Sequence, residues 1–134
     1  MNYKYYFMKG YYTGNVNNTK MDEVKVGKSR DTYIQWLVTR DNNAPYAVRK
    51  FTIKPDGFIQ MHYHDYVETL YILKGICKTY VNDDLLTLKP GDFIFIDSKH
   101  KHRIKNIGTE NLEFVCIINY PENMDIIPVE DNYE

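Results

Sequence analysis

The most informative stretch of this 134-residue sequence reads Gly57-Phe-Ile-Gln-Met-His62-Tyr-His64-Asp-Tyr-Val-Glu68. Residues two apart on a β-strand point to the same face of a sheet, so His62 and His64 would present two imidazoles side by side. Glu68 opens the next apolar run, where it alternates with Leu70. We therefore expect two histidines and one carboxylate to face the same interior.

The sequence around this stretch predicts an all-β fold. Between residues 31 and 120, short apolar runs alternate with turn-forming residues roughly every eight to twelve positions, as in barrels and sandwiches. No helix of four turns fits this pattern without crossing a Gly or Pro. The expected strands are 33–39, 47–54, 58–64, 68–73, 76–82, 85–88, 93–97, 102–106 and 112–120.

The two ends of the chain differ in composition from this region. Residues 1–30 are polar and rich in tyrosine, and we expect an N-terminal arm with a short helix near residues 20–24. Residues 121–134 are acidic and contain two prolines, which predicts a tail that packs across the barrel or frays. The chain thus divides into an arm (1–30), a barrel (31–120) and a tail (121–134).

Composition narrows the possible partners and location. The formal net charge is −1 with acids and bases mixed along the chain, so no clustered basic surface for nucleic acid is expected. No run approaches the ~20 apolar residues of a membrane span, and residues 1–10 do not resemble a signal peptide. Cys77 and Cys116 are too few for a disulfide framework and indicate buried thiols in a reducing compartment. We expect a cytoplasmic protein without a membrane or nucleic-acid partner.

A second histidine cluster could complete a metal site. In the segment 100–106, basic residues alternate with His100, His102, Ile104 and Asn106, which predicts that these four share the inward face. Either histidine could join His62, His64 and Glu68, and spacing alone does not choose between them. Such a ligand set suits Fe, Mn, Ni, Cu or Zn. The alternative reading is a surface pair of histidines with a solvated glutamate, although an unpaired carboxylate between Leu70 and Ile72 would be costly.

At these residues the sequence resembles the cupin superfamily. The first family motif matches Gly57, His62, His64, Glu68 and Gly75, with the first gap one residue short. The second motif matches Gly91, His102 and Asn106, and this register selects His102 over His100 as the ligand. The Pro-x-Gly in the middle of the second motif is replaced by Asp97-Ser98-Lys99.

The resemblance implies a double-stranded β-helix (jelly roll). It also implies one divalent transition metal held by His62, His64, Glu68 and His102. Similar small cupins often form dimers through their N-terminal strands, so a homodimer using the arm is expected. His100 would then be a loop histidine near the mouth of the barrel.

Function follows less directly from the sequence. Our first hypothesis is a metal-dependent oxygenase-type enzyme acting on a small organic molecule in the barrel, because four protein ligands leave positions open on the metal. The alternatives are a non-catalytic cupin that binds or senses a small ligand, and a sugar isomerase or epimerase. The last would need several basic groups in the cavity, where we expect only Arg49. We also expect Cys116 and four phenylalanines to face inward, namely Phe51, Phe93, Phe95 and Phe114.

Overall fold

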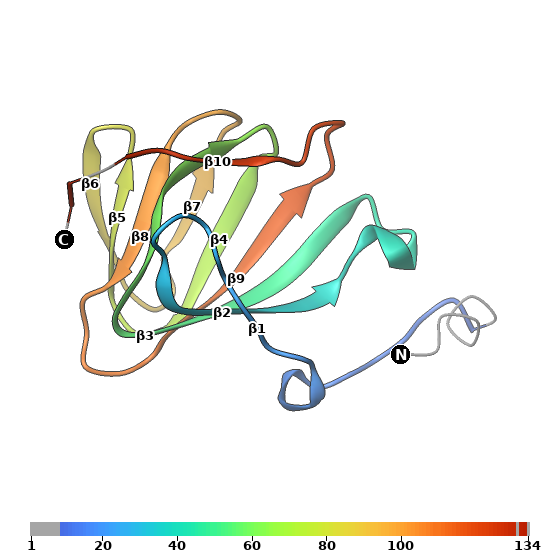
Figure 1. Cartoon of the computed structure of the whole chain (residues 1–134). Coiled ribbons are helices and arrows are strands. Elements are labelled where there is room, and N and C mark those ends of the chain that lie inside the picture. Colours follow the sequence, from blue (N-terminus) through green and yellow to red (C-terminus); the bar gives the residue numbers. More distant parts are fainter. Residues whose placement is uncertain (1–8, 131, 134) are drawn as a thin grey trace.

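The computed structural model describes residues 9–130, 132 and 133, and Figure 1 shows them as a β-barrel with an N-terminal extension. The predicted strand at 33–39 corresponds to β2, and most of the other predicted strands are present within a few residues. Residues 1–8 of the arm and residues 131 and 134 of the tail lie outside the described residues. The elements are η1 (Val16–Asn18), β1 (Asp22–Glu23), β2 (Arg30–Val38), η2 (Arg40–Asn42), β3 (Tyr46–His64), β4 (Glu68–Lys74), β5 (Cys77–Val81), β6 (Asp84–Leu88), β7 (Phe93–Ile96), β8 (His102–Asn106), β9 (Leu112–Asn119) and β10 (Ile126–Pro128).

The long strand β3 joins the two halves of the barrel. Its first half pairs with β2 and β9, while its second half pairs with β8 and β10. The strands β4 and β7 extend the first half, and β5 and β6 extend the second, all in antiparallel order. The all-β jelly roll predicted from the sequence is confirmed, with one difference: the two strands expected at 47–54 and 58–64 are continuous.

A bend in β3 lies where the sequence predicts a turn. Asp56 has a φ of 68°, a backbone conformation that usually marks a turn. Gly57 follows it and passes so close to β2 that an added Cβ would lie 2.9 Å from the backbone oxygen of Arg30. The turn residues therefore bend the strand between its two halves, and the second half carries His62 and His64 into the interior.

The core follows the alternation of side chains along the strands. Phe51 and Phe114 stack with their ring centroids 5.0 Å apart, and both are buried as predicted. The prediction was wrong for Phe93 and Phe95, which are 69% and 58% exposed. These two lie opposite outward-facing residues of β4, so the intervening isoleucines of β7 point inward instead.

Both ends of the described chain pack against their own barrel. Gln35 donates from Nε2 to the backbone oxygens of Val16 and Thr19, and Tyr12 donates to the backbone oxygen of Leu37 at 2.6 Å. The predicted helix near residues 20–24 was wrong, because this segment contains β1, which pairs with β2. The tail contributes β10, which pairs with β3. The homodimer stays a prediction.

No helix among residues 9–130, 132 and 133 is long and apolar enough to cross a membrane.

Two glycines offer a matched test of the turns that close the barrel. Gly75 (φ 85°) and Gly91 (φ 92°) both have a left-handed backbone, but only at Gly75 would an added Cβ meet backbone atoms, at 2.9 Å from Asn111 O and Leu112 Cα. Gly91→Ala should cost about 1–2 kcal/mol of unfolding free energy, from the backbone conformation alone. Gly75→Ala should cost at least about 1 kcal/mol more, because the neighbouring strand must shift. Urea unfolding of both variants checks this, and equal losses would contradict it.

Candidate metal centre

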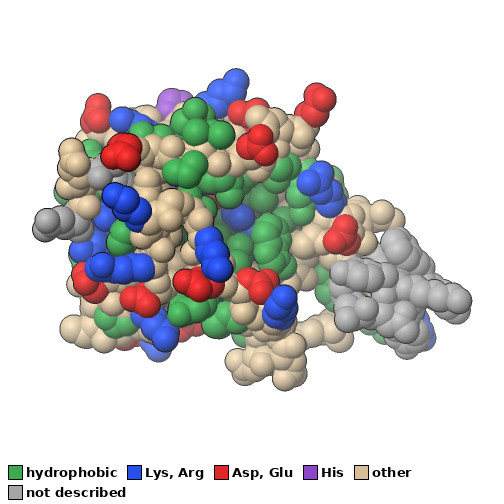
Figure 2. Space-filling model, viewed as in Figure 1, with side chains coloured by type: hydrophobic (Ala, Val, Ile, Leu, Met, Phe, Trp, Pro, Cys, Tyr) green, Lys and Arg blue, Asp and Glu red, His purple; other side chains and the backbone are tan. Residues whose placement is uncertain are grey.

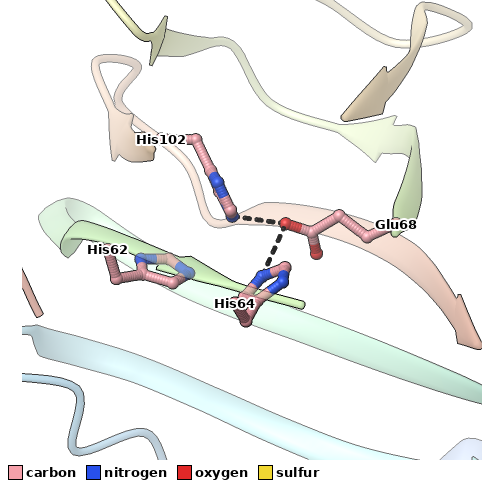
Figure 3. A group of neighbouring side chains, drawn as sticks. All are labelled: His62, His64, Glu68 and His102. Atoms are coloured by element: carbon pink, nitrogen blue, oxygen red, sulfur yellow. Dashed lines mark ion pairs between the residues drawn. The ribbon is translucent and has the colours of Figure 1, made fainter. Parts of the chain in front are cut away.

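Four predicted ligands converge inside the barrel from three strands. His62 and His64 lie near the end of β3, Glu68 begins β4 and His102 begins β8. His62 and His102 are directly opposed in the pairing of β3 with β8, whereas Glu68 reaches them from β4, in the other half of the barrel. One donor atom from each residue lies within 4.8 Å of all the others, and all four side chains are buried. Figure 3 shows the three imidazoles and the carboxylate directed toward a common centre.

Backbone carbonyls orient all three imidazoles in the same way. The Nδ1 atoms of His62, His64 and His102 lie 2.6, 2.8 and 3.0 Å from the carbonyl oxygens of Gln60, Tyr66 and His100. A carbonyl oxygen can only accept, so each neutral ring carries its proton on Nδ1. Each ring therefore presents an unprotonated Nε2, the arrangement that prepares a histidine to ligate a metal.

The carboxylate of Glu68 is shared between the histidines and a second pair of side chains. Its Oε1 contacts His102 Nε2 and lies 3.4 Å from His64 Nε2. Its Oε2 accepts a hydrogen bond from the Cys116 thiol at 3.0 Å and lies 3.7 Å from Arg49 Nη2. This places Cys116 inside the barrel, as predicted, and fixes both oxygens of the carboxylate.

Burial and local charge act on these groups in opposite directions. Burial is the largest effect on His62 and lowers its pKa to about 3, which keeps the ring neutral. Burial opposes ionisation of Glu68, but interactions with His102, a hydrogen bond with His64 and the charge of Arg49 hold the pKa of its carboxyl well below the usual value. Burial lowers the pKa of His102, yet the Glu68 carboxylate outweighs it and leaves that pKa raised. Burial also raises the pKa of Cys116, so this residue is a thiol.

The arrangement fits a metal ion. With the proton of His102 on Nδ1, its buried Nε2 has no hydrogen-bond donor in the described part of the chain and faces Glu68 Oε1, which is also an acceptor. Two such atoms in contact need a cation between them, either a proton or a metal. Three imidazole nitrogens and one carboxylate oxygen form a donor set suited to a divalent transition ion.

His100 lies apart from this centre. Its side chain is exposed and its Nδ1 lies 2.9 Å from Asn82 Nδ2. The turn before His100 contains one residue with a left-handed backbone, Lys99, which has a φ of 68°. The N–H of Lys99 donates to the backbone carbonyl of His64 at 2.8 Å. Replacement of the family Pro-x-Gly by Asp97-Ser98-Lys99 therefore leaves the turn beside the ligands intact.

The remaining motif residue, Asn106, stabilises the strand that carries His102. Its Nδ2 donates to the carbonyls of Ile53 and Glu110, and its Oδ1 accepts from the N–H of Gly108. Arg103 alternates with the predicted inward-facing residues of segment 100–106, yet it too is buried, with its guanidinium 4.6 Å from the ring centre of Phe58.

A cavity of about 520 Å³ adjoins the four ligands. Its walls are mainly apolar and aromatic, and Figure 2 shows a hollow lined by hydrophobic side chains on this face of the molecule. Trp36 and Tyr66 belong to the walls, and the rings of both lie beside the Arg49 guanidinium. Sequence reasoning did not find these two residues, since neither belongs to a motif. Trp36 lies opposite Arg49 in the pairing of β2 with β3, a register that only the structure shows.

Fold and site together define a class of protein: a double-stranded β-helix with a buried three-histidine, one-glutamate cluster beside an apolar cavity. The Cupin_2 family model, described as a cupin domain, matches residues 49–118, and the chain belongs to this family. Family and fold were both predicted correctly from the sequence.

Two relatives and one solved structure illustrate the range of similar proteins. The oxalate-binding protein of Thermotoga maritima is 33% identical over 78 residues, which cover 58% of this chain and 64% of that protein. An uncharacterised HTH-type transcriptional regulator of Bacillus subtilis, YdeC, is 31% identical over 75 residues, 54% of this chain but only 26% of the regulator. The polyketide cyclase RemF of Streptomyces resistomycificus superposes with a TM-score of 0.81 at 18% identity, covering 91% of this chain and 87% of the cyclase. The chain thus spans less than two thirds of both relatives.

Proposed function

We propose that this protein is a metal-dependent enzyme of the oxygenase type that acts on a small organic molecule in the cavity. One observation carries the proposal: three imidazoles, each held through Nδ1 by a backbone carbonyl, converge with Glu68 at the cavity wall. His62, His64, Glu68 and His102 would hold one divalent ion, either Fe, Mn, Ni, Cu or Zn. Four protein ligands leave room in the coordination sphere for a further ligand from the cavity.

A bound ion would supply Lewis acidity and, for the redox-active metals, chemistry with dioxygen. The protein's own residues prepare the site for this. Backbone carbonyls fix the three rings, and the Cys116 thiol holds Glu68 through Oε2. Tyr66 stacks on His64 with 3.6 Å between ring centroids and shields that ring from water. The apolar walls would admit an organic substrate and limit the access of bulk water.

A non-catalytic binding protein is the second candidate, because the chain is similar to the oxalate-binding protein of T. maritima. A phosphate-sugar isomerase has less support. Of the basic residues that line the cavity in the described part of the chain, Lys25 and Arg40 are exposed and only Arg49 is buried.

Oxygen uptake separates these candidates. Protein reconstituted with Fe²⁺ should consume dioxygen when it is screened against small organic acids, diols and enols, and the substrate should change in mass. The His102→Ala variant, treated in the same way, should show the background rate. Ligands that raise thermal stability without any turnover, with every reconstituted metal, would instead identify a binding protein.

A further inference from the structure

Arg49 is a buried cation in the wall of the cavity. Its side chain is 6% exposed, and its guanidinium lies 5.1–5.8 Å from the ring centres of Phe51, Trp36 and Tyr66. Nη2 donates to the Cys116 sulfur at 3.0 Å, which is a weak acceptor. The buried Nε–H has no acceptor in the described part of the chain. A buried N–H of a charged group that lacks an acceptor is costly, so the guanidinium is short of hydrogen-bond acceptors within the described protein.

Glu68 does not fully balance the charge of Arg49. The oxygen of Glu68 nearest to Arg49 is Oε2, which lies 3.7 Å from Arg49 Nη2. The same oxygen accepts a hydrogen bond from the Cys116 thiol. The other oxygen of Glu68 faces the histidines and would serve the metal. With three neutral imidazoles and a divalent ion in place, the buried groups would carry a net positive charge. The rim adds Lys25, Arg40 and Asp41, all exposed, and these do not offset it.

We propose that Arg49 is an anion-binding residue and that the cavity takes an organic acid whose carboxylate pairs with the Arg49 guanidinium next to the metal centre. This inference rests on the proposed function, because it names the substrate class of that site. Guanidinium groups pair with carboxylates through paired, charge-assisted hydrogen bonds. A single buried basic group matches one carboxylate better than a phosphate ester, which usually recruits several donors.

The shape and walls of the cavity restrict the rest of the acid. A volume of about 520 Å³ lies within the range of small-molecule sites, roughly 300–1,000 Å³. Phe51, Phe114, Ile59 and Ile104 are apolar wall residues, so an apolar body should follow the carboxylate. A dicarboxylate as small as oxalate would leave most of this volume unfilled.

Trp36 makes the inference measurable, because it is the single tryptophan of the chain and lies beside Arg49 in the cavity wall. We would titrate the Zn²⁺-loaded protein with 3-phenylpropionate and with the neutral 3-phenylpropanamide, following tryptophan fluorescence. The wild type should bind the acid at least tenfold more tightly than the amide. Arg49→Met should remove this preference while the amide still binds, and Arg49→Lys should retain part of it. Arg30, which is exposed, pairs with Asp56 and does not line the cavity, provides the control, and Arg30→Gln should behave like the wild type.

Metal analysis and a metal-free titration distinguish the possible failures. A metal ion also attracts carboxylates, so the preference for the acid should persist, though weaker, in metal-free wild type and disappear in metal-free Arg49→Met. Equal affinity for acid and amide in the wild type, no response to the acid, or an undiminished preference in Arg49→Met would each overturn the role of Arg49. If the wild type binds no metal, the proposed function fails, whereas a preference that depends on Arg49 would still support the anion site.

Discussion

Replacing His102 with alanine is expected to reduce bound metal from about one equivalent to almost none, whereas His100→Ala should bind metal like the wild type. The two histidines are two residues apart, yet only His102 Nε2 lies within the cluster, while His100 is exposed beside Asn82. His62→Ala should resemble His102→Ala, because the two rings are adjacent in the cluster, with their centroids 4.3 Å apart. Removing one of four ligands also leaves a polar void that water can enter. Plasma mass spectrometry of untagged protein, after reconstitution and dialysis, gives the metal-to-protein ratio.

The identity of the metal also bears on the proposed function. Iron, manganese, nickel or copper at one equivalent would direct the search to dioxygen-dependent substrates. Zinc would preserve the ligand set but argue against oxygenase chemistry, because it has no redox chemistry of its own. Equal metal content in His100→Ala and His102→Ala, or no metal in the wild type after reconstitution with each ion, would contradict the site.

The sequence predicted side-chain direction correctly in those segments where polar and apolar residues alternate. The ligands lie in segments with a clear two-residue period, and the pairing of His62 with His102 agrees with the expected inward faces. In the run Phe93-Ile-Phe-Ile96 every residue is apolar, so periodicity carries no information about direction. We expected Phe93 and Phe95 to face inward, but pairing with β4 turns both outward.

Interactions between distant segments could not be predicted in this way. The contacts of Glu68 with Cys116 and of Arg49 with Tyr66 join residues 48 and 17 positions apart, and they depend on the packing of β3 and β4 against β9. The sequence did indicate that Arg49 and Cys116 face inward, because both alternate with buried neighbours. It did not indicate that they share the carboxylate of a predicted ligand. Local alternation thus predicted that His62, His64 and Glu68 share one interior with a histidine of the segment 100–106, and the family resemblance selected His102. Tertiary packing added the charge environment around these predicted ligands.

Glu68→Gln is expected to reduce the unfolding free energy of the metal-free protein by about 3–5 kcal/mol, the usual cost of removing one partner from a buried ion pair. Glutamine keeps the size of the side chain but removes its charge. His102 can respond by losing its proton, since Glu68 is what raises its pKa. Arg49 has no such response, because a guanidinium stays protonated, so a buried cation remains without a carboxylate. The loss should therefore come mainly from Arg49.

Glu113→Gln is the matched control for this effect. Glu113 pairs with Lys50 at 2.5 Å, but both side chains are partly exposed, at 24% and 16%, so water can replace the lost partner. This variant should lose about 1 kcal/mol or less. Urea unfolding of chelator-treated proteins measures both, and adding Arg49→Met to Glu68→Gln should recover part of the loss if the unbalanced cation causes it. Equal losses in the two single variants would show that Arg49 does not depend on Glu68, and the charge balance assigned to this site would then be incorrect.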